Sequence, residues 1–516
     1  MSEIIFKRSM NIGTISAESD QEFLNNCFIE TPEYEEICDF ENKKMILLGR
    51  TGSGKTALLN QIKNDVNKVI EVRPDTFALQ YITNVPLVSK LLNEGVNLDI
   101  FFKFLWLHEI MAYIIKHVFI YDHKKIIEAL SEKIKDRGRI GQLKKYLSEY
   151  DGIFFDEGCT EKITKEFEKE IDGALGDNIL NVQGKLSENL KKEIEIKASQ
   201  YINNKQIKQL KNIITLFKEY FESNSQKKIA VIIDNLDENW IDDKTKYRLI
   251  DALLNAIRLF IDIPNIKILL AMRADLLEKT CQITNRQNEK DESFTLRLNW
   301  TKSMLKELLD KRIQYLFQYK YKKNTKITFE NIFNTEINGI KVSDYIIDRT
   351  MMRPRDAINF TNLCIQAADN ANSISGDNII QAEKIFKQER FKALKHEWGG
   401  VFGNIDTYFK ILPILGNCFN YQDLLNYEKY SAVEMILYEN DYFTEKLVGI
   451  KNYDRVIYER IFKELLNIMY TIGFIGIKDD VTNQVEFSTP YHSTLSELDF
   501  AENLAFVVHP LFKIKE

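Results

Sequence analysis

The stretch MILLGRTGSGKTALL, residues 45–59, decides how this chain folds. Its apolar start (45–48) predicts a short buried strand, and its apolar end (57–62) predicts a helix. Between them, residues 49–56 fit the P-loop (Walker A) pattern G-x-x-x-x-G-K-[ST] at every fixed position. The predicted nucleotide-binding residues are Gly49, Arg50, Thr51, Gly52, Ser53, Gly54, Lys55, Thr56 and Ala57.

Each residue type in this loop has a chemical role in binding a nucleotide. Glycines let the backbone curl, so that N–H groups and the N-terminus of the following helix point at an anion. Lys55 is expected to neutralise the β- and γ-phosphate oxygens, and the Thr56 hydroxyl is expected to occupy one position on Mg²⁺. The sequence therefore predicts ATP and Mg²⁺ as cofactors.

Length and composition indicate a globular chain of several domains. At 516 residues we expect about two to four domains. Hydrophobic residues make up 44% and charged residues 28%, which is ordinary for such proteins. The formal net charge of −6 argues against a surface that is basic throughout, although a local basic patch would be compatible with it.

The cysteine pattern and the hydropathy predict a cytoplasmic protein without a membrane partner. The six cysteines form no C-x-x-C pair and no metal-ligand spacing with the six histidines, so we expect reduced thiols. No apolar run reaches the ~18 residues that a membrane span needs. The richest segment, residues 101–120, carries charged residues and histidines, and it predicts a buried helix.

A second part of the nucleotide site is predicted where the strand at 228–233 ends in Asp234. Ligands of parallel sheets bind at the carboxyl ends of the strands. Asp234 is therefore expected to hold Mg²⁺ through water, opposite Thr56. Another strand is expected at residues 68–72.

The residues after Asp234 leave the general base open. Asn235 follows it directly, where many ATPases of this class carry Glu, and an amide cannot accept a proton from water. Asp237 is the first candidate for base or water-positioner, and Glu238 is the second. Alternatively, both carboxylates cap the helix expected to begin near Asp242.

Two arginines are candidate phosphate sensors. Arg273 follows the strand at 266–272 and would lie beside the γ-phosphate if that strand lies between the other two site strands. The alternative is a surface pair with Asp275. Arg353 and Arg355 flank a proline that starts a helix, where cations oppose the helix dipole and need an anionic partner such as ATP phosphate. The alternative is a surface arginine pair.

The remaining sequence predicts three further regions. Residues 76–225 show helical periodicity and are expected to form an insertion in the core (1–75 and 226–299), either as an arm for a partner or as a packing domain. Residues 300–395 are expected to be helical. In 396–516, a helix (454–470), a strand (472–477), a polar turn and a strand (485–487) predict a winged helix, although acidic residues in the turn would repel DNA.

The combined motifs resemble a family of bacterial P-loop ATPases close to the KAP and STAND NTPases and, more distantly, to the origin-recognition type of AAA+ ATPase. The motifs are SAESD (16–20), LGRTGSGKT (48–56), IDNLD (233–237), MRAD (272–275), RPR (353–355) and VHP (508–510). The resemblance implies an α/β core with a parallel sheet of the additional-strand type, a helical lid (300–395), a winged-helix end (396–516) and nucleotide-dependent oligomerisation. It implies sensor roles for Arg273 and Arg355. Many members of these groups act in bacterial phage defence.

These observations favour a regulatory Mg²⁺-dependent ATPase that forms homo-oligomers and controls a separate effector protein, as part of an antiviral system. One alternative is a DNA-binding ATPase of the origin-recognition or transposition-regulator type. Another is a scaffold that binds ATP tightly and hydrolyses it slowly.

Overall fold

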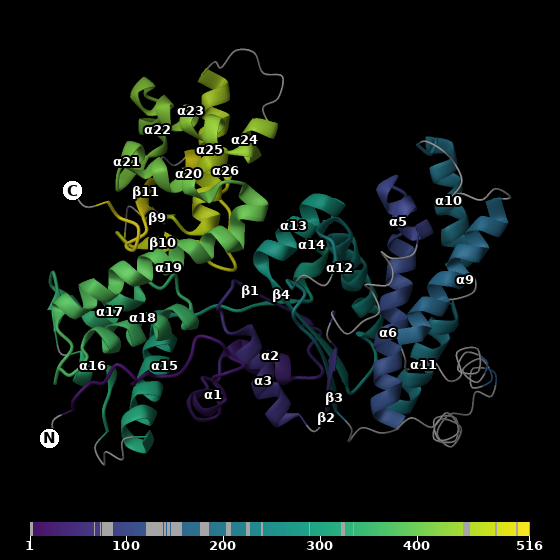
Figure 1. Ribbon diagram of the computed structural model, residues 1–516, viewed down its shortest axis with the longest axis horizontal. Coiled ribbons are helices and arrows are strands. Elements are labelled where there is room, and N and C mark those ends of the chain that lie inside the picture. The colour runs from purple at the N-terminus through teal and green to yellow at the C-terminus, as the bar shows by residue number, and fades with distance from the viewer. Residues whose placement is uncertain are drawn as a thin grey trace. The chain divides into compact units, whose positions relative to one another are not determined.

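The computed structural model forms two compact units, which are described separately (Figure 1). Unit 1 comprises Met1–Thr31, Gly49–Ala57 and Arg297–Glu516, and unit 2 comprises Pro32–Leu48 and Leu58–Leu296. The structure describes residues 4–66, 68–72, 74, 86–119, 138, 141, 145, 157–175, 185–202, 208–222, 228–238, 241–287, 289–320, 326–333, 335–446, 455–479, 482–501 and 504–514.

Unit 2 is built on a five-stranded sheet with the order β2-β3-β4-β1-β5. The strands are β1 (Ile46–Gly49), β2 (Lys68–Val72), β3 (Ile229–Ile233), β4 (Ile266–Arg273) and β5 (Thr295–Arg297). β2, β3 and β4 are parallel, with Val69 opposite Ala230 and Ala230 opposite Lys267. β3 is buried along its whole length, as expected of a parallel strand covered on both faces. The predicted α/β architecture with a parallel sheet is confirmed.

Helices surround this sheet and continue into the predicted insertion. They are α2 (Pro32–Cys38), α3 (Lys55–Asp65), α5 (Pro86–Asn93), α6 (Asp99–Phe119), α9 (Glu157–Leu175), α10 (Glu188–Tyr201), α11 (Lys208–Glu222), α12 (Asp243–Ile257), η4 (Arg258–Phe260), α13 (Ala274–Thr284) and α14 (Glu289–Glu292). Part of the insertion predicted to be helical (76–225), including most of residues 126–147, lies outside the described residues.

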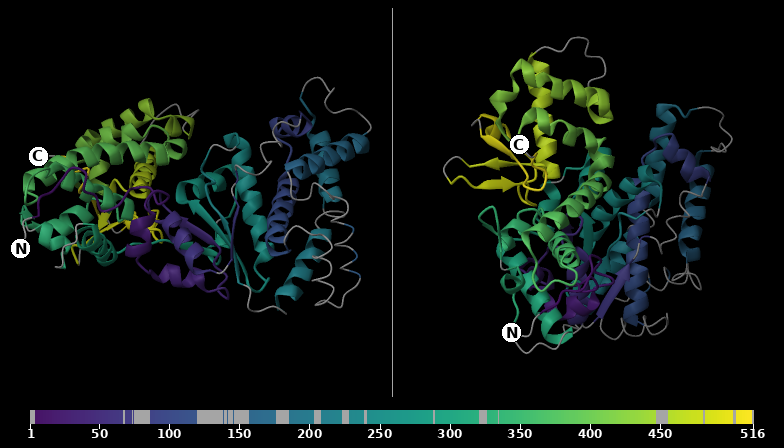
Figure 2. Two further views of the ribbon diagram at one scale, coloured as in Figure 1. Left: turned by 60° about the horizontal axis from the view of Figure 1, so that its bottom comes forward. Right: turned by 60° about the vertical axis from the view of Figure 1, so that its left-hand side comes forward.

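The apolar helix α6 joins these helices to the core. It contacts α12, α10 and β2, and Figure 2 shows it running alongside α12. Its Trp106 is fully buried, and the indole Nε1 donates to the Leu249 carbonyl of α12 at 2.8 Å. The described helices include none that is both long and apolar enough to cross a membrane.

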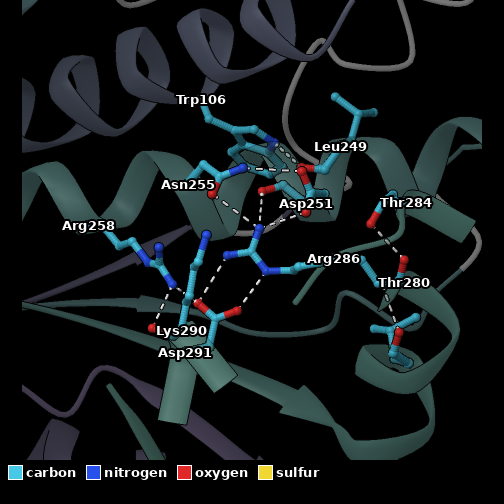
Figure 3. Close-up of polar contacts among 11 residues, drawn as sticks. Trp106, Leu249, Asp251, Asn255, Arg258, Thr280, Thr284, Arg286, Lys290 and Asp291 are labelled. Carbon is cyan, nitrogen blue, oxygen red and sulfur yellow. Dashed lines mark hydrogen bonds and ion pairs between the residues drawn. The ribbon is translucent and has the colours of Figure 1, made fainter. Parts of the chain in front are cut away.

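A buried ion-pair network joins α12 to the segment that precedes β5 (Figure 3). Arg286 donates through Nη1 to Asp251 Oδ1 at 2.6 Å and through Nε to Asp291 Oδ2 at 2.6 Å. Asp291 is fully buried and also accepts from Arg258. Because each buried charge has an opposite charge in contact, the network fixes these segments without leaving an uncompensated ion.

Unit 1 is mostly helical. Its elements up to the end of the predicted lid are α1 (Gln21–Cys27), α15 (Lys302–Tyr315), η5 (Leu316–Lys320), α16 (Phe329–Ile332), β6 (Glu336–Ile337), β7 (Ile340–Lys341), α17 (Val342–Ile347), α18 (Pro354–Ala367) and α19 (Gly376–Phe402). The later helices are α20 (Ile405–Lys410), α21 (Leu412–Leu415), α22 (Tyr421–Leu424), η6 (Tyr427–Lys429), α23 (Tyr430–Glu439), α24 (Asp441–Lys446), α25 (Arg455–Ile472) and α26 (Glu497–Ala501). A buried apolar cluster runs through both groups of helices.

The C-terminal part of unit 1 contains a four-stranded sheet with the order β10-β9-β11-β8, which lies beside α25 (Figure 2). The strands are β8 (Cys418–Asn420), β9 (Ile475–Lys478), β10 (Val485–Phe487) and β11 (Ala505–Val508). Helix α25 and the antiparallel β9 and β10 follow the predicted helix–strand–turn–strand order. Asp480, in the turn, lies outside the described residues. The fold alone does not assign this segment to DNA or to protein.

His509 follows β11 and has a structural place. It is 3% exposed, and its Nδ1 accepts the Leu511 N–H at 3.3 Å. Burial, together with the charges of nearby arginines, lowers the pKa of His509 to about 3. The ring is therefore neutral and serves as an acceptor inside the core.

Candidate nucleotide-binding site

The P-loop (residues 49–57) has the backbone that its glycines allow. β1 ends at Gly49 and α3 begins at Lys55. Gly52 has φ 80° and Gly54 has φ 95°, conformations that other L-residues rarely adopt. A Cβ on Gly52 would lie 2.9 Å from Arg355 Cβ, so glycine also allows the close approach of a neighbouring helix.

Two carbonyls in the middle of the loop are held by the start of α18. The Thr51 carbonyl accepts from Arg353 Nη1 at 3.1 Å. The Gly52 carbonyl accepts from the Arg355 backbone N–H at 3.3 Å. Because a peptide unit is planar and trans, its C=O and N–H point in opposite directions. A tied carbonyl therefore orients the N–H of the next residue away from α18.

Other carbonyls of the loop are held in the same way. Ser53 C=O accepts from Trp300 Nε1 at 2.8 Å. The Lys55 Nζ donates to the Gly49 carbonyl at 2.9 Å and to the Arg50 carbonyl at 3.1 Å. The carbonyls of residues 49–53 thus all accept hydrogen bonds. The Ser53 N–H also closes a turn onto the Arg50 carbonyl at 3.1 Å.

The anionic partner that Arg353 needs is a buried carboxylate. Arg353 Nη1 lies 2.9 Å from Glu397 Oε2, and the two side chains are 2% and 1% exposed. Burial alone would raise the pKa of Glu397, but the charges of Arg353, Arg50 and Arg390 lower it to about 2. The expectation that Arg353 meets a nucleotide phosphate is therefore replaced by an internal ion pair.

Two methionines before Arg353 carry unusual backbone angles. Met351 has φ 50° and Met352 has φ 53°, so two consecutive non-glycine residues are left-handed. Each such residue costs on the order of 1 kcal/mol or more and persists only when its surroundings impose it. Here the imposed turn aims Arg353 at the Thr51 carbonyl.

Arg355, a predicted phosphate sensor, lies against the P-loop. Besides the contact of its backbone with Gly52, its Nε donates to the Ile15 carbonyl at 3.1 Å. Burial lowers the pKa of Arg355, and the neighbouring Arg390 adds to this while Asp356 opposes it. The guanidinium therefore sits where an additional anion would be favourable.

The segment before α1 is fixed by a buried ion pair. Asp20 Oδ2 accepts from Arg312 Nη2 at 2.7 Å, and Asp20 Oδ1 accepts the Thr14 N–H at 2.8 Å. Asp20 is the N-cap residue of α1, but its side chain forms no cap bond to the helix. Its carboxylate instead binds Arg312 and the Thr14 N–H.

In unit 2, Asp234 directly follows β3 and is half-buried. Its Oδ1 accepts the Asn235 N–H at 2.9 Å, and Asn235 is left-handed with φ 64°. In the sheet order, β4 lies between β3 and β1. This is the arrangement on which the sensor role of Arg273, at the end of β4, depends.

Arg273 holds two carboxylates within unit 2. Its Nε and Nη2 bind both oxygens of Asp275, at 2.9 and 2.6 Å, and its Nη1 lies 3.1 Å from Asp237 Oδ2. Burial would lower the pKa of Arg273, but these carboxylates raise it. The expected pairing with Asp275 is present, and the predicted base Asp237 joins it.

The helix after this edge is capped by another residue. Asp242 accepts the Thr245 N–H at 3.0 Å as the N-cap of α12. Asp237 and Glu238 are both exposed and do not serve as that cap. Asp242, and neither Asp237 nor Glu238, therefore caps α12.

The residues present fit a nucleoside triphosphate with Mg²⁺. Gly52 and Gly54 curl the loop through positive φ angles, a Cβ at Gly52 would collide with Arg355, and α3 begins at Lys55 with its N-terminus after that loop. Thr56 and Asp234 are half-buried oxygen donors of the kind Mg²⁺ takes.

Comparison with known proteins adds three likenesses. Residues 303–395 match the family described as the FunZ-associated C-terminal helical domain. The chain is 22% identical over 523 residues to the "putative transposon gamma-delta 80.3 kDa protein" of Escherichia coli strain K12, covering 98% of this chain and 67% of that protein. The solved Walker-type ATPase paby2304 of Pyrococcus abyssi covers 90% of this chain and 95% of its own, at 12% identity and a TM-score of 0.35, a likeness too low to carry an argument.

Sequence reasoning missed the groups that hold the loop from outside. Trp300 and Glu397 belong to no motif, and each contacts its partner only because distant segments pack together. The one available signal was the RPR motif, which predicted charged groups near the loop but not which of them would be neutralised.

Proposed function

We propose that this chain is an Mg²⁺-dependent ATP-binding and ATP-hydrolysing protein. The observation that carries the proposal is the P-loop whose carbonyls, from residue 49 to 53, accept hydrogen bonds from within unit 1. In this role the loop N–H groups and Lys55 bind the phosphates. Thr56 and Asp234 hold Mg²⁺, which would neutralise phosphate charge when bound.

The hydrolytic step is assigned to the edge after β3 and β4. Asp237 acts as general base or water-positioner, with Glu238 as the second candidate, and Arg273 and Arg355 sense the phosphates. The Asp237–Arg273 ion pair supports a slow reaction, because the pair must open before Arg273 can bind phosphate. Turnover would rise when Arg273 exchanges Asp237 for phosphate.

The biological role that we propose is regulatory. ATP binding would drive a conformational change or homo-oligomerisation that controls an effector protein in a cytoplasmic antiviral system. The helical insertion (76–225), the helical lid (300–395) and the winged-helix-like end (396–516) would transmit the change. The match of residues 303–395 to the family described as the FunZ-associated C-terminal helical domain supports treating that segment as a module.

A DNA-binding ATPase is the second candidate. It is favoured by one observation, the transposon name of the E. coli relative, which describes that protein. Salt-dependent binding of duplex DNA would support it, since phosphate contacts release counterions. No binding at low salt would remove it.

Calorimetry of the full chain with ATP and Mg²⁺, followed by steady-state hydrolysis, tests the proposal. Saturable binding with slow turnover is expected, and sizing by light scattering with and without ATP tests oligomerisation. Binding without turnover would leave only the scaffold, and no binding at millimolar ATP would overturn the proposal.

A further inference from the structure

The P-loop side chain Arg50 reaches a helix end about 420 residues further along the chain. Its Nη2 donates to the Thr471 carbonyl in the last turn of α25. Its guanidinium carbon lies 5.7 Å from the ring centroid of Trp398, on α19. We call Arg50, Thr471 and Trp398 the Arg50 clasp.

The clasp supplies a hydrogen-bond donor to a backbone carbonyl that has no partner within α25. The last carbonyls of a helix have no intrahelical partner. Met469 C=O accepts the Phe474 N–H at 2.8 Å and Tyr470 C=O accepts the Gly473 N–H at 2.9 Å. The Thr471 carbonyl instead accepts from the arginine.

The chemistry of both partners favours a cation at this point. A helix C-terminus carries partial negative charge, so a guanidinium there is stabilised. The indole face of Trp398, 3% exposed, attracts the same cation from another direction. Gly473, with φ 94°, lies beside the clasp: a Cβ there would be 2.6 Å from Met351 Cε and 3.4 Å from Arg50 Nη1.

The clasp acts on the same peptide units that the phosphates would contact. The Arg50 carbonyl accepts from Lys55 Nζ and from the Ser53 N–H. Fixing the Arg50 side chain therefore fixes the start of the loop, from which the orientation of the later N–H groups follows. A binding loop held in its bound form spares part of the ordering cost of binding.

The clasp also borders open space. A cavity of about 760 Å³ in unit 1 is lined by Arg50, Ser53, Trp300, Met351, Gly473 and His509, among others. Arg50 can therefore leave Thr471 without first displacing tightly packed core residues.

We propose that Arg50 is a positioning residue that couples ATP at the P-loop to the end of α25 and the sheet that follows it. An intact clasp and bound nucleotide stabilise each other. Since such coupling is reciprocal, loss of the clasp weakens nucleotide binding and nucleotide tightens the end of α25. The inference rests on the proposed ATP-binding function.

Hydrogen–deuterium exchange of the peptide 469–477, with and without a non-hydrolysable ATP analogue and Mg²⁺, tests the coupling. In the wild type, the analogue should slow exchange at Gly473 and Phe474. Arg50→Ala should bind the analogue about 5- to 20-fold more weakly by calorimetry and lose this slowing. Arg50→Lys keeps the positive charge but loses the planar guanidinium with its several N–H donors. It should slow exchange by an amount between those of the wild type and Arg50→Ala.

Two further variants distinguish the effect of losing the clasp from the effect of a general loss of structure. Arg455→Ala removes an exposed arginine of the same helix and should leave affinity and slowing unchanged. Trp398→Phe keeps an aromatic ring with a weaker attraction for the cation and should behave like Arg50→Lys. Circular dichroism confirms that each variant is folded.

The outcomes distinguish this inference from the function on which it rests. If the wild type binds the analogue but exchange at 469–477 does not change, or if Arg50→Ala keeps the change, the coupling is wrong and ATP binding stands. If the wild type does not bind the analogue, the proposed function fails, and the coupling with it.

Discussion

The P-loop in unit 1 and the acidic edge after β3 and β4 in unit 2 are organised in opposite ways. The loop is held from outside, since Trp300, Arg353 and Arg355 bind its carbonyls. The side chains of the acidic edge bind one another, since Arg273 pairs with Asp237 and Asp275. A loop whose amides are already oriented favours binding. In contrast, Arg273 and its two carboxylates must separate before any of them can act on a substrate. For the proposed function, the difference favours ATP binding that is prepared in advance and turnover that depends on a rearrangement.

The largest effect is expected from the loop itself. Lys55→Ala should abolish ATP binding in calorimetry, because the charge that neutralises the β- and γ-phosphates is lost. The matched control is Lys63→Ala on the same helix, a lysine whose partner is Glu71 at 3.0 Å. Normal ATP binding by Lys55→Ala would show that the loop is not part of the ATP site, and its contrast with the acidic edge would then have no functional meaning.

On the acidic edge, Asp237→Ala should leave ATP binding intact and reduce turnover by about 10²- to 10⁴-fold, the usual contribution of a general base. Glu238→Ala should retain most turnover. Steady-state hydrolysis under saturating ATP measures both. Normal turnover of Asp237→Ala, with loss in Glu238→Ala, would transfer the role to Glu238.

The support of the loop is tested through the buried pair Arg353–Glu397. Arg353→Ala leaves a buried carboxylate without its partner and should lower the free energy of unfolding by about 3–5 kcal/mol. Lys410→Ala, which breaks the more exposed pair with Glu439, should cost less than about 1 kcal/mol. Urea denaturation measures both, and equal small losses would show that the loop needs no such support.

The same pair predicts a pH dependence of stability. The pKa of Glu397 falls from 4.5 to about 2 in the folded chain. Its stabilisation is therefore fully present above pH 4.5 and is lost as pH falls toward about 2. Denaturation between pH 5 and pH 3 should show a smaller loss in Glu397→Gln than in the wild type.

The smallest effect concerns one hydrogen bond to the loop. Trp300→Phe keeps the ring but removes the indole N–H that binds the Ser53 carbonyl, so ATP affinity should fall by about 1 kcal/mol, or about 5-fold. An unchanged affinity of Trp300→Phe would show that the loop carbonyls need no external donor.

Local sequence signals predicted the elements of the core well. The P-loop pattern, the apolar strands and the proline that starts α18 each fix structure over a few residues, and the elements they predict lie where the sequence placed them. The extra strand β4 between β3 and β1 also matches the expected order. These features depend on periodicity and on turn chemistry, which are local.

The partners of the site residues could not be predicted in this way. Arg353 and Arg355 look equivalent in the RPR motif, yet one is neutralised by Glu397 and the other lies on Gly52. The choice depends on where α19 passes, and therefore on packing over the whole helical region. The same holds for Trp300, because its ring reaches the loop only after α15 is in place.

Asn235 restricts how this protein could evolve a faster reaction. The obvious single change would be Asn235→Glu, which supplies the acid that many P-loop ATPases carry after the aspartate. Yet Asn235 is left-handed, with φ 64°, a conformation that asparagine tolerates and that costs a longer side chain roughly 1–2 kcal/mol. A lineage seeking higher turnover would have to remodel the backbone after β3 as well, so this adaptive route requires at least two steps.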